Sequence, residues 1–259
     1  MTPSDPSPSS ILVDVELPAP APLPPKLVAA LASLRVVLVG WYAVPEQTSP
    51  AQARDQFGAE AQAALDTVAR RFAEAGATGT TSRLVFTGSK FDTLTRISTE
   101  EDCDAVLIPG TLERLRRLLV PLRGLQNAGH IVPFVADLVQ DGGTTNVTLL
   151  HVLQEEETEA GVQADLFGPV VEQLAAQGVQ TDLVERRVVT TDDPADTIVE
   201  AAAHHDLVVL GETKPSVRSV LFGTVPEHIV RAVDLPVVVV RHEEDDVTVA
   251  ERAAQSDAH

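Results

Sequence analysis

The stretch Asp206–Arg241 reads DLVVLGETKPSVRSVLFGTVPEHIVRAVDLPVVVVR. It begins with a short apolar run that ends at Gly211, passes through a basic loop to a second glycine, Gly223, and closes on a run of valines after Pro236. Short β-branched runs bounded by Gly and Pro indicate buried strands. The stretch therefore predicts a strand at 206–211, a helix at about 225–234 and a strand at 235–241.

The sequence before this stretch alternates in the same way. Further strands are predicted at 116–122, 146–153 and 186–191, and helices at 126–140, from about 154 to Gln177, and at 192–205. Asp193 is placed to cap the last of these helices, and Pro194 suits its first position. Strands that alternate with helices predict an α/β fold, in which a mostly parallel sheet has helices on both faces.

The first half of the chain repeats this pattern. The matching pairs, in order, are RVVLVGWYAVPE (35–46) with NVTLLHVLQEEE (146–157), RLVFTGSKFDTL (83–94) with RVVTTDDPADTI (187–198), and CDAVLIPGT (103–111) with HDLVVLGET (205–213), while ILVDVEL (11–17) takes the place of RRLLVPL (116–122). We therefore predict two tandem copies, of which the first has no counterpart of residues 214–241. The predicted divisions are a disordered N-terminus at 1–9, a truncated copy at 10–113, a full copy at 114–241 and a disordered acidic tail at 242–259.

The composition limits the partners. The 259 residues carry 38 acidic against 19 basic side chains and a formal net charge of -19. This balance disfavours nucleic acid or an anionic membrane surface as a partner. It suits a salt-rich cytoplasm, although an ordinary acidic soluble protein is the alternative. Neither a secretory signal nor an apolar run long enough to span a bilayer is apparent, so the sequence predicts a cytoplasmic protein.

Catalytic and metal-binding motifs are not evident in the sequence. Cys103 is the only cysteine, which excludes an intramolecular disulfide and a cysteine-built metal site. His204 and His205 are neighbours and do not share a helix face, and His151 lies in a predicted strand, where we expect a packed side chain. The sequence therefore predicts no catalytic residue, no metal site and no enzyme.

The blocks RRLLVPLRG, DDPADTIVEAA, DLVVLGETK and LFGTVPEHIVRAVDLPVVVVR, in this order across 116–241, resemble the universal stress protein family. The resemblance implies an open, mostly parallel sheet of five strands, of the adenine nucleotide alpha hydrolase type. Some members bind ATP at the carboxyl ends of the strands. Others dimerise or regulate a partner, and several are cytoplasmic domains of transporters. It therefore implies a homodimeric regulator of a stress response, or of a transporter in trans.

The resemblance also implies a nucleotide site, which departs from the family pattern. In ATP-binding members the phosphate loop is Gly, two residues, Gly, nine residues and Gly-Ser/Thr, whereas here Lys214 stands at the second glycine and eight residues separate it from Gly223. Arg123 replaces an aspartate, and a guanidinium only donates hydrogen bonds. The predicted ligand is ATP, AMP or a cyclic dinucleotide, and the first copy is expected to bind none. The predicted site residues are Leu122, Arg123, Gly211, Lys214, Arg218, Gly223, Thr224 and Val225.

Alternative interpretations remain for this region. Thr224 and Glu227 have the spacing of a helix capping box, which by itself explains both residues. The valine strand at 235–241 is expected to be an exposed edge, through which a module that binds no nucleotide would pair with a second copy. Hydrolysis of ATP is the least favoured alternative. A cluster of arginines marks the junction of the copies, and of these Arg116 and Arg117 are expected to face solvent or acidic neighbours.

Overall fold

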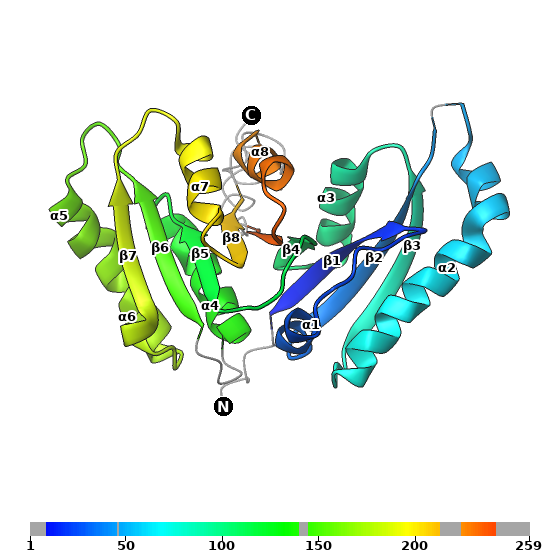
Figure 1. Cartoon of the computed structure of the whole chain (residues 1–259), viewed down its shortest axis with the longest axis horizontal. Helices are drawn as coiled ribbons and strands as arrows, with labels where there is room; N and C mark the ends of the chain where they lie inside the picture. The colour runs from blue at the N-terminus through cyan, green and yellow to red at the C-terminus, as the bar shows by residue number, and fades with distance from the viewer. Residues whose placement is uncertain (1–8, 46, 140–144, 213–223, 242–259) are drawn as a thin grey trace, which may run out of the picture.

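The computed structural model describes residues 9–45, 47–139, 145–212 and 224–241. The predicted N-terminal and C-terminal disordered segments lie outside these residues, apart from Ser9. The described chain forms three layers, in which one curved sheet separates two groups of helices (Figure 1). The predicted α/β class with a mostly parallel sheet is confirmed.

The sheet has nine strands in the order β3-β2-β1-β4-β9-β8-β5-β6-β7. The strands are β1 (Ser10–Leu17), β2 (Arg35–Ala43), β3 (Thr80–Thr87), β4 (Ala105–Ile108), β5 (Arg117–Pro121), β6 (Asn146–Val152), β7 (Val184–Val189), β8 (Leu207–Gly211) and β9 (Val237–Val240). Neighbouring strands run parallel, except that β4 and β9 are antiparallel. The order β3-β2-β1-β4 in the first half is matched by β7-β6-β5-β8 in the second half, as the repeated sequence pattern predicts.

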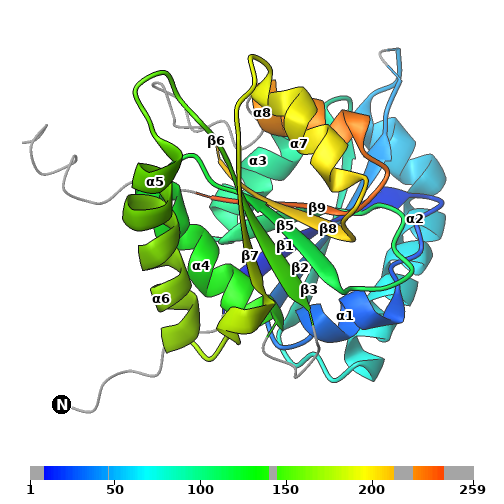
Figure 2. The ribbon, with the colours of Figure 1, turned by 60° about the vertical axis from the view of Figure 1, so that its left-hand side comes forward.

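The helices cover both faces of the sheet. They are α1 (Pro25–Leu31), α2 (Pro50–Glu74), α3 (Lys90–Glu100), α4 (Leu125–Val139), α5 (Glu159–Val162), α6 (Gly168–Ala176), α7 (Pro194–Ala202) and α8 (Thr224–Ala232). Figures 1 and 2 show α3, α7 and α8 on one face and the other helices on the opposite face. Asp193 caps α7 as predicted, because its carboxylate accepts the Asp196 N–H at 3.1 Å, and Pro194 follows.

The valine strand β9 lies inside the sheet. Val238 pairs with Val209 of β8 on one side and with Leu107 of β4 on the other. The prediction of an exposed edge at 235–241 was therefore wrong. The described residues of the first half include no fifth strand of its own, and β9 of the second half pairs with the side of β4 that such a strand would occupy. A second copy of the chain has no access to this strand.

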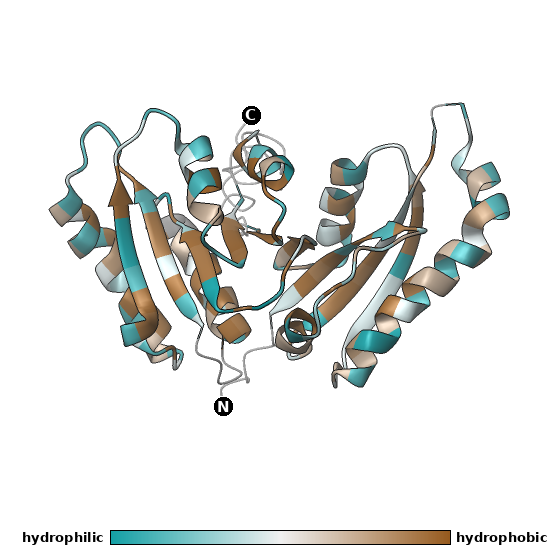
Figure 3. Cartoon of the chain, in the orientation of Figure 1, coloured by the Kyte–Doolittle hydropathy of each residue, from teal (hydrophilic) through white to brown (hydrophobic). Residues whose placement is uncertain are grey.

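Two apolar clusters fill the space between the sheet and its helices. One packs beneath α1, α2, α4 and α6, and the other packs beneath α3, α7 and α8. Both contain residues from either half of the chain, and Figure 3 shows mostly hydrophobic residues along the strands and many hydrophilic residues along the helices and loops. Burial of β-branched and leucine side chains on both faces is typical of a parallel sheet.

Gly110 follows β4 and packs against the turn that precedes β9. A Cβ at this position would overlap the carbonyl group of Leu235. Next to it the Thr111 N–H donates to the Asp234 carbonyl at 2.5 Å. The end of β4 and the turn before β9 thus touch backbone to backbone, and only glycine leaves room for that contact.

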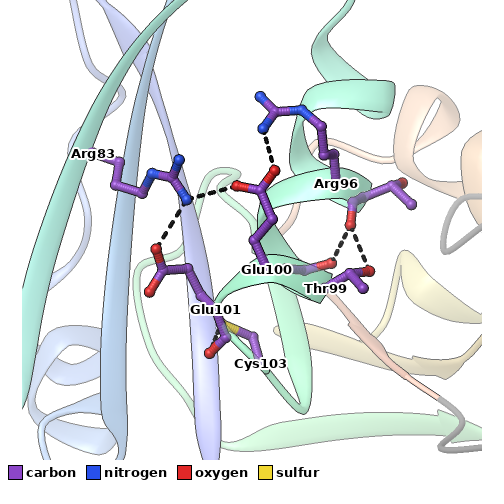
Figure 4. A network of polar contacts seen from close by, with 8 residues as sticks. Arg83, Arg96, Thr99, Glu100, Glu101 and Cys103 are labelled. Atoms are coloured by element: carbon purple, nitrogen blue, oxygen red, sulfur yellow. Dashed lines mark hydrogen bonds and ion pairs between the residues drawn. The ribbon is translucent and has the colours of Figure 1, made fainter.

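A surface ion-pair network joins β3 to the end of α3 (Figure 4). Arg83 donates to Glu100 and Glu101 at 2.9 Å each, and Arg96 donates to Glu100 at 2.6 Å. Hydrogen bonds from these two arginines hold the pKa of Glu100 below its ordinary value, and the bond from Arg96 has the larger effect. Cys103 lies nearby, and burial raises its pKa to about 11, so this thiol is protonated and unreactive near neutral pH.

Candidate functional site

The strand order reverses between β5 and β8. Consecutive strands run outward from β5 through β6 to β7, whereas β8 and β9 lie on its other side. In open α/β sheets, ligands bind outside the carboxyl ends of the strands at such a point. Leu122 follows β5 here and is 3% exposed, and Gly211 is the last residue of β8. The predicted site residues Leu122, Arg123 and Gly211 thus lie at one end of adjacent strands.

Two helices begin at the same end of the sheet. α4 follows β5 and starts at Leu125, and α8 starts at Thr224, on the other face. Leu125 and Val225 are 47% and 38% exposed and are the exposed large hydrophobic residues of the described chain. Helix N-termini offer N–H groups and a partial positive charge to an anion. This end of the sheet therefore presents both apolar and anion-attracting groups.

A buried histidine fixes the backbone after β5. His151 is 1% exposed, as the prediction of a packed histidine requires. Its Nδ1 lies 2.8 Å from the Leu122 carbonyl, and its Nε2 lies 2.7 Å from Glu157. Hydrogen bonds from His151 and from the Gln154 N–H hold the pKa of Glu157 below its ordinary value. Both ring nitrogens thus face acceptors, and the ring ties Leu122 to the loop after β6.

Arg123 is exposed and borders a cavity of about 420 Å³. The cavity is lined by Arg123, Gly124, Leu125, Glu156, Glu157, Thr158, Gly161, Val162, Asp165 and Leu166. Three of these residues are carboxylates, so the interior disfavours a phosphate and favours groups that donate hydrogen bonds. The sequence predicted Arg123 as a site residue, but the prediction did not include these acids. The EEE run at 155–157, directly after a predicted strand, was the available signal.

The remaining predicted residues divide between two groups. Thr224 and Val225 lie in the first turn of α8, both exposed. Glu227 makes a 2.6 Å ion pair with Arg231, one turn further along the helix. Lys214, Arg218 and Gly223 lie outside the described residues, so their place in the site stays a prediction.

The first half has a buried ion pair at the carboxyl end of β1. Lys90 bonds Asp14 at 2.5 Å and lies over the ring of Trp41 at 5.3 Å. Burial raises the pKa of Asp14 above its ordinary value, while Lys90 acts in the opposite direction. The cavity beside the pair is about 60 Å³, too small for a nucleotide. Nothing in the sequence pattern indicated this pair, because Asp14 and Lys90 lie on different elements, β1 and α3.

The other histidines of interest have structural partners. The Nδ1–H of His205 donates to the Ala201 carbonyl at 2.7 Å, its Nε2 lies 3.0 Å from the Thr148 hydroxyl, and burial lowers its pKa. His228 lies 3.0 Å from Asp196. Within the part of the chain that the structure describes, no three His, Cys, Asp or Glu residues are grouped so as to hold a metal ion.

Solved structures share this fold. A universal stress protein from Archaeoglobus fulgidus DSM 4304 is 13% identical, covers 90% of this chain and 97% of its own, and has a TM-score of 0.60. A protein of unknown function from Pseudomonas aeruginosa PAO1 is 14% identical, covers 94% of this chain and 97% of its own, and has a TM-score of 0.51. A universal stress protein from Archaeoglobus fulgidus in complex with dAMP is 16% identical, covers 49% of this chain and 98% of its own, and has a TM-score of 0.38.

The sequence comparisons concern the second half of the chain. A search of curated protein sequences found no match. The family model described as "Universal stress protein family" matches residues 114–241, which include β5 to β9 and the candidate site. This is the segment in which the sequence blocks predicted the resemblance. The chain therefore belongs, through residues 114–241, to the universal stress protein family.

Proposed function

We propose that this protein is a nucleotide-responsive regulator whose ligand binds at the carboxyl ends of β5 and β8. The observation that carries the proposal is that Leu125 and Val225, the exposed large hydrophobic residues of the described chain, stand at the N-termini of two helices that flank the strand-order reversal. Exposed apolar side chains suit the base of a nucleotide, and the helix N-termini beside them suit its phosphates. The degenerate loop pattern makes this site a variant of the family's ATP site.

The chemistry assigns different parts of a nucleotide to different residues. The phosphates are placed toward the first turn of α8 and Arg123, because a guanidinium pairs with phosphate through parallel hydrogen bonds. The sugar hydroxyls are placed toward the carboxylates of the neighbouring cavity, such as Glu156 and Asp165, which accept hydrogen bonds. These acids would then accept the hydrogen bonds of the sugar hydroxyls in place of the aspartate that Arg123 replaces. The His151 hydrogen bond to the Leu122 carbonyl holds the end of β5 in place beside both groups of residues.

Arg123→Ala is expected to weaken binding of the nucleotide by about tenfold or more, because a hydrogen bond to a charged group contributes about 1.5–3 kcal/mol. Isothermal titration of the full chain with ATP, AMP and a cyclic dinucleotide measures this. Arg70→Ala is the matched control, since Arg70 lies on α2, bonds Thr67 on the same helix and is remote from the site. Its affinity should equal that of the parent protein.

Two results would overturn the proposal. In one, none of the three ligands produces heat or a thermal shift with the parent protein. In the other, Arg70→Ala weakens binding as much as Arg123→Ala does, which would indicate general charge attraction and no defined site.

The proposed role is regulation of a stress response or of a transporter in trans, within the cytoplasm and without catalysis. Among the described residues, no helix is both long and apolar enough to cross a bilayer. The first half is proposed to bind no nucleotide, since Lys90 already neutralises Asp14 there. A proposed homodimer has to use a surface other than β9, and sedimentation of the parent protein measures whether one forms.

A further inference from the structure

A second cavity lies at the other end of the strands. It has a volume of about 660 Å³, within the range of small-molecule sites. Its lining residues are Thr111, Leu112, Glu113, Arg114, Arg116, Arg117, Asn146, His205 and Asp206. Arg117 and Asn146 begin β5 and β6, and Asp206 precedes β8. The cavity is therefore at the amino ends of the strands that carry the candidate nucleotide site at their carboxyl ends.

Three arginines, two in the linker between β4 and β5 and one at the start of β5, line this cavity. Arg114, Arg116 and Arg117 are all exposed. Within the described residues, none of the three guanidinium groups has an ion pair or a side-chain hydrogen bond with the protein. In a chain of net charge -19, three such cations within four residues are a marked concentration of positive charge.

The carboxylate of Asp206 is engaged with the linker backbone. Its Oδ2 accepts the N–H groups of Arg116 at 2.8 Å and Arg117 at 2.9 Å. This acid therefore orients the linker backbone, and the three guanidinium groups have no partner among the described residues. Glu113 is the other acid of the lining, so the arginines outnumber the carboxylates.

His205 adds no charge to the cavity. Its Nδ1 donates to the Ala201 carbonyl, so Nε2 accepts from the Thr148 hydroxyl in the neutral ring. The side chains of Asn146 and Thr111 supply neutral hydrogen-bond donors beside the arginines. We propose that this cavity is a second, separate binding site for a small anion that carries phosphate groups. Arginine is suited to such a ligand, because its planar donors match phosphate oxygens in pairs.

Pyrophosphate is the probe that tests the site. Titrated into the full chain at constant ionic strength, it should bind, and Arg114→Gln/Arg117→Gln should weaken it by about tenfold or more, because each arginine supplies charged hydrogen bonds. Arg186→Gln/Arg187→Gln removes the same charge from two neighbouring exposed arginines on β7 and should leave the affinity unchanged. Arg123→Gln removes the guanidinium group proposed to bind nucleotide phosphates, so the pyrophosphate affinity that this variant retains, and that Arg114→Gln/Arg117→Gln then removes, belongs to the second site. Inorganic phosphate and ATP, titrated in parallel, distinguish a free phosphate from a phosphate ester as the ligand.

Three outcomes would overturn the proposal. Pyrophosphate does not bind the parent protein, or the Arg114/Arg117 variant binds it equally well, or both double variants lose the same affinity. The second outcome would mean that the arginines only balance Glu113, Asp206 and the carboxyl end of α7. Arg114→Gln alone, outside any strand, repeats the test with a change that leaves β5 intact, and circular dichroism verifies the fold of every variant.

Discussion

Val238→Lys is expected to destabilise the native fold strongly. Val238 is fully buried and pairs with β8 and β4 on its two sides, so a lysine there has neither solvent nor an acid to meet its charge. An uncompensated buried charge costs about 3–5 kcal/mol. That is a large part of the about 5–15 kcal/mol that stabilises a typical domain. Urea denaturation followed by circular dichroism measures the loss.

Val225→Lys is the control for this substitution, because it places the same side chain at an exposed valine. It should lower the free energy of unfolding only slightly. The expectation for Val238→Lys would be wrong if the variant kept near-parental stability. It would also be wrong if the variant were a well-folded monomer obtained from an oligomeric parent, which is the result that an exposed edge strand predicts.

Gly110→Ala is expected to lower the free energy of unfolding by about 1–3 kcal/mol, the usual cost of forcing extra volume into a packed site. The added methyl group meets the Leu235 carbonyl, which is main chain and cannot rotate aside as a side chain does. The turn before β9 must shift, and the Thr111–Asp234 hydrogen bond with it. Chemical denaturation provides the measurement.

Gly129→Ala serves as the matched control. Gly129 lies within α4, and a Cβ there meets no atom within 4 Å. Alanine in a helix interior is better than glycine by about 0.5–1 kcal/mol, so this variant should be slightly more stable than the parent. If the Gly110→Ala variant were as stable as the parent, the prediction would be wrong, because the backbone of the turn before β9 could then move away from β4 without loss of stability.

The strands and helices of this chain are predictable because their signals are local. The valines of β9, the capping Asp193 and the buried runs of β5 and β6 each reveal their conformation within a few residues. The position of β9 in the sheet is not determined by the residues around it in the sequence. It depends on the open side of β4, which exists because the first half ends without a fifth strand. A valine run has the same appearance at an edge and in the interior of a parallel sheet.

The candidate site was predictable to a similar extent. Gly211 and Arg123 could be predicted as site residues because each lies at or just beyond the end of a strand that borders the strand-order reversal. The acids near Arg123 and the His151 bond to Leu122 depend on how the loop after β6 folds back over β5. The Asp14–Lys90 pair likewise joins residues of different elements. Contacts of this kind are made in three dimensions, and no spacing along the chain encodes them.

The shared position of β9 has a consequence for the order in which the protein is made. Ala105 of β4 pairs with Val240, one of the last residues that the structure describes. During synthesis from the N-terminus, β1 to β4 emerge first, and the hydrogen-bonding groups along one side of β4 have no partner. An unpaired strand side of this kind attracts other chains. During synthesis this side of β4 is therefore available to other chains until β9 emerges and pairs with it.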